Sequence, residues 1–172
     1  MTYQQVDALS DSSVILALQE LTETLPGAED GSGVRSEADA RAAVVRLLAE
    51  AGVADLDPDE LLASEDEAMT AARRLLSLAV ADPDTGRVAE DLVRDPPLDE
   101  QMSLEAAITG AVVLAALVGW LQMKISLHVW RKGDRTEFDF RVGKQAASPE
   151  VLRSVAETVS GLLGGNAGPP PP

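Results

Sequence analysis

The 172-residue chain has no cysteine and only one histidine, and aromatic residues make up 3% of it. The lack of cysteine excludes disulfides, thiolate catalysis and cysteine-ligated zinc. With so few aromatic residues, the core has to be built from Ala, Leu and Val, which helices tolerate better than sheets do. Walker, dinucleotide-binding and HExxH motifs are also missing. The sequence therefore predicts no cofactor and no metal ion.

His128 is the only histidine, so it is the only imidazole that could act as a general acid or base. It alternates with Ser126 along a predicted strand, and Asp139 is expected beside it on the paired strand. These residue types superficially resemble a Ser–His–Asp catalytic set. However, residues two apart on one strand are separated by about 7 Å, too far for a hydrogen bond between nucleophile and base. We interpret His128 and Asp139 as a surface pair and predict no catalytic residue and no enzyme.

Basic residues are scarce in the front of the chain, and the net charge is −15. Residues 1–106 carry 7 Lys and Arg against 24 Asp and Glu, whereas residues 107–172 carry 7 against 5. Such an acidic excess repels phosphates, so no nucleic-acid partner is expected. The acidic clusters lack the spacing of a calcium-binding loop, and helix capping explains them better. Because the N-terminus lacks a basic start and an apolar run, we expect a cytoplasmic protein.

Residues 106–121 form a stretch of 16 residues without a charge. They are apolar on all sides, which predicts a buried helix from about residue 104 to 121, with Ser103 as its cap. Its uncharged length of about 24 Å is short of a membrane core of about 30 Å. A helix buried in protein is therefore favoured, and a membrane-associated helix is the alternative.

Four small residues recur at intervals of four along this helix and form a ridge: Ala107, Ala111, Ala115 and Gly119. Small residues allow another helix to approach closely. The simpler interpretation is an alanine-rich core helix with chance spacing. The more specific one is a contact between helices of two subunits.

Apolar residues at helical spacing predict that the acidic front of the chain is helical. Residues 1–10 are expected to be a loose lead-in and residues 27–33 a flexible linker. The predicted helices span residues 12–24, 36–51, 57–62, 64–80 and 87–94. Their expected caps include Asp11 or Ser12, Ser36 and Ser64. For residues 75–81 a short strand is the alternative, because the apolar residues there also alternate.

After residue 124 the apolar pattern changes to a period of two, and Gly133-Asp134 suits a type II′ hairpin turn. One face of this hairpin is expected to be apolar, with the pairs Val129–Phe138, Leu127–Phe140 and Ile125–Val142. The other face is expected to hold the pairs Trp130–Glu137, His128–Asp139 and Ser126–Arg141. A last helix is predicted from the cap Ser148 to about residue 163.

These elements together predict an α+β, mostly α fold, in which an acidic helical N-terminal region precedes a helix–β-hairpin–helix unit. The expected segments are residues 1–35, 36–97, 98–164 and 165–172, the last a disordered proline-rich tail. A two-stranded hairpin is marginally stable alone, so the flanking helices are expected to cover its apolar face. Its exposed edges favour pairing with another strand.

The order of motifs in residues 104–163 resembles the effector-associated constant component family of actinobacterial conflict systems. The shared features are Trp120-Leu121 at the end of a small-residue helix, Lys124, the Gly-Asp-Arg-Thr turn of residues 133–136, and Ser-Pro-Glu-Val-Leu at residues 148–152. The turn differs from the family's Asp-Gly order. The resemblance implies a non-enzymatic accessory protein of a multi-component antiviral defence or signalling system.

We therefore expect an adaptor that binds a protein partner, either an effector or a second copy of itself in a homo-oligomer. The alternatives are a membrane-associated component anchored through residues 106–121, or a precursor processed near Gly164-Gly165. The residues expected to make the interaction are Ala107, Ala111, Ala115, Gly119, Trp120, Trp130, His128 and Asp139.

Overall fold

The computed structural model describes residues 2–25, 36–97, 106–142 and 144–163. The helices are α1 (Thr2–Ala8), α2 (Asp11–Thr24), α3 (Glu37–Glu50), the 3-10 helix η1 (Pro58–Glu60), α4 (Glu65–Ala81), α5 (Gly86–Arg94), α6 (Ala106–Lys124) and α7 (Pro149–Leu162). The strands are β1 (Ser126–Lys132), β2 (Arg135–Val142) and β3 (Gln145–Ala146), which form one antiparallel sheet in the order β1-β2-β3. The predicted α+β, mostly α fold is confirmed.

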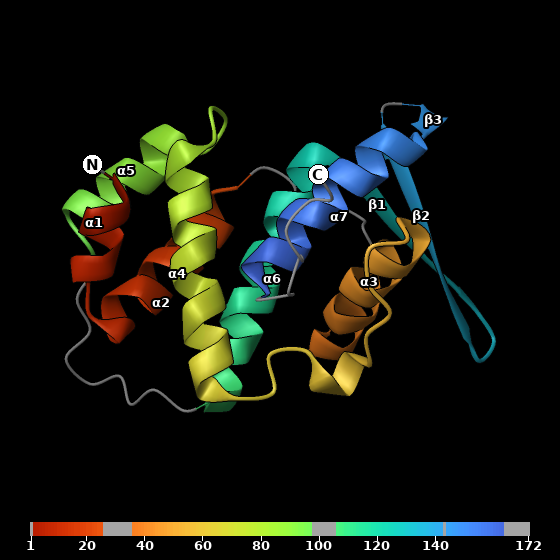
Figure 1. Ribbon diagram of the computed structural model, residues 1–172, viewed down its shortest axis with the longest axis horizontal. Helices are drawn as coiled ribbons and strands as arrows, with labels where there is room; N and C mark the ends of the chain where they lie inside the picture. Colours follow the sequence, from red (N-terminus) through yellow and green to blue (C-terminus); the bar gives the residue numbers. More distant parts are fainter. Residues whose placement is uncertain (1, 26–35, 98–105, 143, 164–172) are drawn as a thin grey trace, which may run out of the picture.

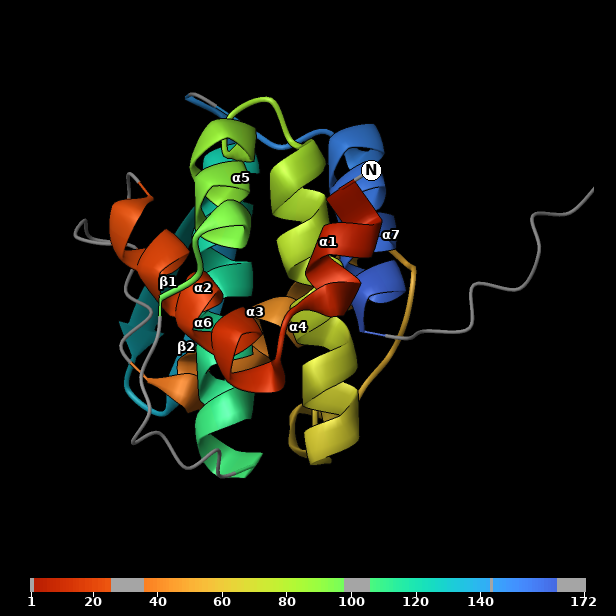
Figure 2. The same ribbon diagram turned by 90° about the vertical axis from the view of Figure 1, so that its left-hand side faces the viewer.

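Helix α6 lies in the middle of the molecule, with α1, α2 and α5 on one side and α3 and the hairpin on the other (Figures 1 and 2). It contacts α2, α3, α4 and β1. Val113, Leu114, Leu117 and Leu121 are all buried in one core cluster that extends from Val6 to Leu162. The prediction of a helix buried in protein is confirmed, although the expected start at residues 103–105 lies outside the described residues.

Within the described ranges, no helix is both long and apolar enough to cross a membrane. The expected linker at residues 27–33, the tail at residues 165–172 and the glycine pair Gly164-Gly165 lie outside those ranges.

Most helix ends follow from local chemistry, as expected. The hydroxyls of Ser36, Ser64 and Ser148 accept hydrogen bonds from the backbone N–H groups of Asp39, Glu67 and Val151. Each bond satisfies one of the amides that a helix start leaves without a partner. At α2 the expected cap is wrong, because Ser10, and not Asp11 or Ser12, accepts from the Ser13 N–H.

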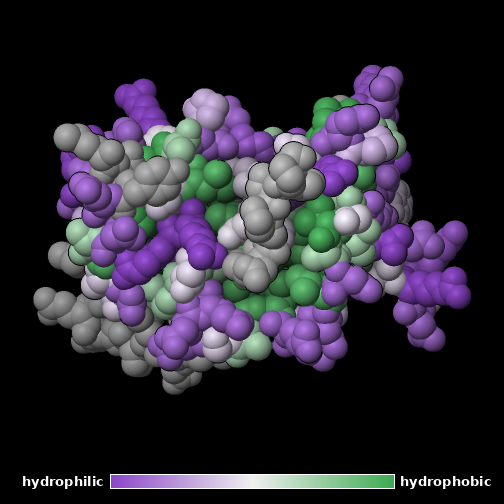
Figure 3. Space-filling view, viewed as in Figure 1, coloured by the Kyte–Doolittle hydropathy of each residue, from purple (hydrophilic) through white to green (hydrophobic). Residues whose placement is uncertain are grey.

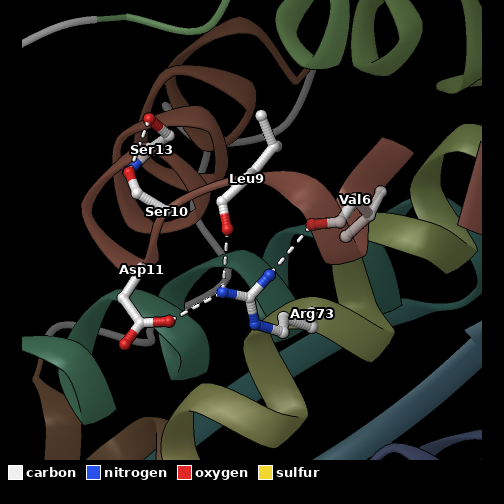
Figure 4. Close-up of polar contacts among 6 residues, drawn as sticks. All are labelled: Val6, Leu9, Ser10, Asp11, Ser13 and Arg73. Atoms are coloured by element: carbon white, nitrogen blue, oxygen red, sulfur yellow. Dashed lines mark hydrogen bonds and ion pairs between the residues drawn. The ribbon is translucent and has the colours of Figure 1, made fainter. Parts of the chain in front are cut away.

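The expectation of a loose lead-in at residues 1–10 is wrong, because α1 occupies most of it. Val6 is fully buried, and Arg73 of α4 donates hydrogen bonds to the carbonyls of Val6 (2.9 Å) and Leu9 (3.0 Å) (Figure 4). The same guanidinium contacts the Asp11 carboxylate at 2.7 Å. These contacts reach across more than 60 residues of sequence, so no local pattern reveals them.

The alternative of a strand at residues 75–81 is also wrong, since α4 continues to Ala81. Leu75, Leu76, Ala79 and Val80 are buried at helical spacing. Thr85 then donates from its hydroxyl to the Ala79 carbonyl at 2.6 Å, which fixes the turn into α5. The apolar alternation in this segment is a by-product of a helix that is buried on several sides.

The hairpin has the predicted register for five of the six expected pairs, from Trp130–Glu137 to Ser126–Arg141. Gly133 has φ +59°, and Asp134 does not have a positive φ, as a type II′ turn requires. The pair Ile125–Val142 is wrong. Ile125 is 2% exposed and donates its N–H to the Leu121 carbonyl, at the end of α6, whereas Val142 pairs with Gln145 of β3 and is 48% exposed.

Alanine substitutions at Gly86 and Gly161 are expected to change the stability of the protein in opposite directions. A Cβ at Gly86 meets the backbone carbonyl oxygen of Val80 at 2.8 Å, so Gly86→Ala is expected to destabilise the protein by about 1–3 kcal/mol. A Cβ at Gly161, in the last turn of α7, meets nothing within 4 Å. Gly161→Ala is expected to stabilise the protein by about 0.5–1 kcal/mol. Urea unfolding of both variants tests this, and equal stability of the two would contradict the close approach at Gly86.

Candidate functional site

The β1–β2 hairpin has one covered face and one exposed face. Leu127 and Phe140 are buried, and Val129 and Phe138 are half-buried against the core. Arg131, farther along the same face, forms an ion pair with Asp39 of α3, whose side chain is mostly buried. The hairpin is therefore held on the helices by apolar contacts near its base and by an ion pair closer to its turn.

The end of the hairpin extends past the helices. A groove of about 640 Å³ separates it from α3 and is lined by Ala42, Val45, Arg46, Ala49, Pro58 and residues 135–138. Figure 1 shows the turn projecting beyond α3, and Figure 3 shows hydrophilic side chains at that place. This part of the hairpin is open to a partner.

Strand β1 is an edge strand, and the direction of its backbone groups follows from the register. The Ala147 N–H donates to the Phe140 carbonyl, so the backbone groups of Phe140 point away from β1. Leu127 and Phe140 are therefore a non-hydrogen-bonded pair. Hydrogen-bonded and non-hydrogen-bonded pairs alternate along an antiparallel ladder, so Val129–Phe138 and Arg131–Thr136 are also non-hydrogen-bonded pairs. A two-residue turn closed by a hydrogen-bonded Lys132–Arg135 pair gives the same assignment.

It follows that the N–H and C=O groups of Leu127, Val129 and Arg131 point away from β2. Leu127 is only 3% exposed, so the groups that a partner can reach are those of Val129 and Arg131. No other group in the described part of the chain forms a hydrogen bond with them. A row of such groups along an exposed strand is a template for another strand. Arg131 was not among the residues expected to make the interaction. Its outward backbone becomes apparent only once the register is known.

The exposed face carries three of the predicted interaction residues, Trp130, His128 and Asp139, together with Ser126. Trp130 lies in the middle of β1 and is 57% exposed. His128 and Asp139 are opposite one another, as predicted, but Asp139 accepts its hydrogen bond from Arg141 at 2.6 Å. Ser126 lies on the same strand as His128. The structure thus places these polar residues on a strand surface, where they can contact a partner.

The small-residue ridge of α6 is divided between two environments. A Cβ on Gly119 lies 3.3 Å from the Leu25 side chain and 4.0 Å from that of Thr22, so this end of the ridge packs on α2 of the same chain. Ala111 is half-buried and Ala115 is exposed, whereas the side chain of Ala107 is outside the described part. The close helix approach that the ridge predicts occurs within one chain at Gly119.

Trp120 is buried in a polar cluster and does not reach the surface. Its indole N–H donates to Asp82 Oδ2 at 3.3 Å, and Lys124 Nζ contacts the same oxygen at 2.6 Å. Lys124 also contacts Asp84 at 3.2 Å and lies 5.9 Å from the centre of the Trp120 ring. This cluster joins the end of α6 to the α4–α5 turn.

Charge pairing governs the titration of this cluster. Burial alone raises the pKa of Asp82, but hydrogen bonds from Lys124, the Asp84 N–H and Trp120 outweigh it and hold the pKa below its ordinary 3.8. Burial lowers the pKa of Lys124, and its bonds to Asp82 and Asp84 outweigh that effect and raise the pKa above 10.5. No buried side-chain nitrogen or oxygen of the described residues, those of this cluster included, lacks a hydrogen-bond partner, which indicates a structural role.

Within the described residues, no three His, Cys, Asp or Glu side chains are close enough to hold a metal ion. Comparison with family models, with curated proteins and with solved structures finds no match to this chain. The candidate site therefore rests on the geometry of the hairpin, and its central features are the free edge of β1 and the exposed Trp130.

Proposed function

We propose that this chain is a non-enzymatic interaction protein, an accessory component of a multi-protein bacterial defence or signalling system, that binds a protein partner through its β-hairpin. The observation that carries the proposal is the free edge of β1, with accessible outward backbone groups at Val129 and Arg131. Strand addition to such an edge is a common mode of recognition, in which main-chain hydrogen bonds supply affinity. Residues 104–163 resemble an accessory family of such systems, and this resemblance supports a search for the partner among the other components of the system.

A proline at position 131 tests the role of the edge. Arg131→Pro removes one outward N–H while keeping every hydrogen bond to β2, and edge strands tolerate such a proline. Arg131→Ala is the matched control, because it loses the same ion pair with Asp39 but keeps the N–H. Tagged wild-type protein is expected to retain a partner from extracts of its native host, Arg131→Ala to retain it, and Arg131→Pro to lose it.

Light scattering of the purified variants shows whether the partner is a second copy, since self-association should then disappear in Arg131→Pro alone. If the wild type is a monomer and captures the same proteins as Arg131→Pro, the proposed function is wrong.

A further inference from the structure

We infer that the partner adds an acidic extended strand to the free edge of β1, an inference that rests on the proposed function and specifies its ligand. Val129 and Arg131 face outward and are not buried, so they offer two N–H donors and two C=O acceptors. A segment of about five residues is sufficient to satisfy them, because a strand uses every second residue for one neighbour. The partner need not be folded before it binds.

The charge of β1 selects the partner. The strand SLHVWRK contains two basic residues and no acidic one, within a chain whose net charge is −15. Lys132 is exposed and takes part in no ion pair with any described residue. The acids of the hairpin's exposed face, Glu137 and Asp139, are on β2, one strand farther from the free edge. Because Arg131 is already paired with Asp39, Lys132 is the positive charge that an incoming strand meets at this edge.

Trp130 adds an apolar contact to this charge. It is 57% exposed and stands between His128 and Lys132 on the outer face of the edge strand. An aromatic side chain on an edge covers the aliphatic part of a residue directly across from it, and opposite charges placed across strands are also favourable. The expected partner sequence alternates acidic residues with β-branched ones, and an acid lies opposite Lys132.

A second copy of this chain fits the edge poorly. An antiparallel pairing of two β1 strands centred on Val129 places Arg131 and Lys132 of each copy opposite Leu127 and Ser126 of the other, so no acidic residue lies opposite Lys132. The observations thus favour an acidic strand from a different protein.

The test uses the full-length protein and two seven-residue capped peptides, one alternating valine with glutamate and the other alternating valine with lysine. Amide hydrogen exchange is followed by NMR at saturating peptide. With the glutamate peptide, the N–H groups of Val129 and Arg131 are expected to exchange at least tenfold more slowly. The N–H groups of His128 and Trp130, already bonded to β2, serve as an internal control and should change little.

Variants separate backbone pairing from charge. Arg131→Pro is expected to abolish binding of the glutamate peptide, whereas Arg131→Ala retains it. Lys132→Glu should weaken binding of the glutamate peptide by about fivefold or more and improve binding of the lysine peptide, since one cross-strand charge pair changes sign.

Three results would overturn the inference. If both peptides bind equally, the edge does not select charge. If neither binds, the basic residues guard the edge against association. If the glutamate peptide binds without protecting the outward N–H groups of Val129 and Arg131, it binds elsewhere. None of these results decides the proposed function, which the host-extract experiment tests separately.

Discussion

Replacing Asp82 with alanine is expected to destabilise the protein by about 3 kcal/mol, one of the two largest effects we predict. Asp82 is 8% exposed and accepts from Lys124 at 2.6 Å, from Trp120 at 3.3 Å and from the Asp84 N–H at 2.8 Å. Removing one partner of a buried ion pair leaves the other charge without compensation, and costs about 3–5 kcal/mol. The lower end applies because Lys124 keeps its contact with Asp84.

Denaturant unfolding measures this loss, and Asp84→Ala is the matched control. The Asp84 side chain is largely exposed, and an exposed ion pair contributes about 0–1 kcal/mol. A double variant, Asp82→Ala with Lys124→Met, should recover part of the loss because it also removes the uncompensated ammonium. If Asp82→Ala and Asp84→Ala cost the same, the buried pair is not what joins α6 to the α4–α5 turn.

The same pair predicts a pH dependence whose sign is fixed by the two pKa shifts. The folded protein holds the pKa of Asp82 below 3.8, so this stabilisation is present above that pH and lost as pH falls through the folded value. The pKa of Lys124 is raised above 10.5, so its contribution is present below that pH and lost as pH rises through the folded value. The free energy of unfolding of the wild type should therefore decrease more steeply than that of Asp82→Ala as the pH falls below about 4.

What the sequence predicts and what it misses differ in the range of the interactions involved. The caps Ser36, Ser64 and Ser148 act on amides three residues away, and the hairpin register follows from a two-residue turn and an alternating pattern. These determinants are local, so the sequence reveals them. The free hairpin edge was expected for the same reason, because a two-stranded pattern always leaves edges.

The missed features depend on residues far apart in the sequence. Helix α1 is held by Arg73, and Trp120 finds its partner 38 positions away at Asp82. The sequence indicates only that Asp82 belongs to a turn. A tryptophan that follows an apolar run is equally compatible with a core position and with a contact surface. A buried lysine at a helix end is the one available signal, since Lys124 closes the apolar segment and needs an acidic partner if it is covered.

Leu114→Ala is expected to cost about 3–4 kcal/mol and to unfold the whole protein more easily. Leu114 is 1% exposed in the middle of α6, and this helix contacts α2, α3, α4 and β1. Leucine-to-alanine changes in cores remove transfer free energy and leave a cavity, which costs about 3–5 kcal/mol where the neighbours cannot collapse. Neighbours on several elements restrict such a collapse, because each is also fixed by its other contacts.

The control is Leu56→Ala, at a leucine that is 36% exposed in the loop before η1, for which we expect a loss below about 1 kcal/mol. Circular dichroism and tryptophan fluorescence should give coincident unfolding curves for Leu114→Ala, because a single core cluster joins α6 to the other helices. If the helical signal persists while the hairpin is lost, α6 supports only its own segment. Since Ile125 connects α6 directly to β1, the position of the free edge depends on this helix remaining in place.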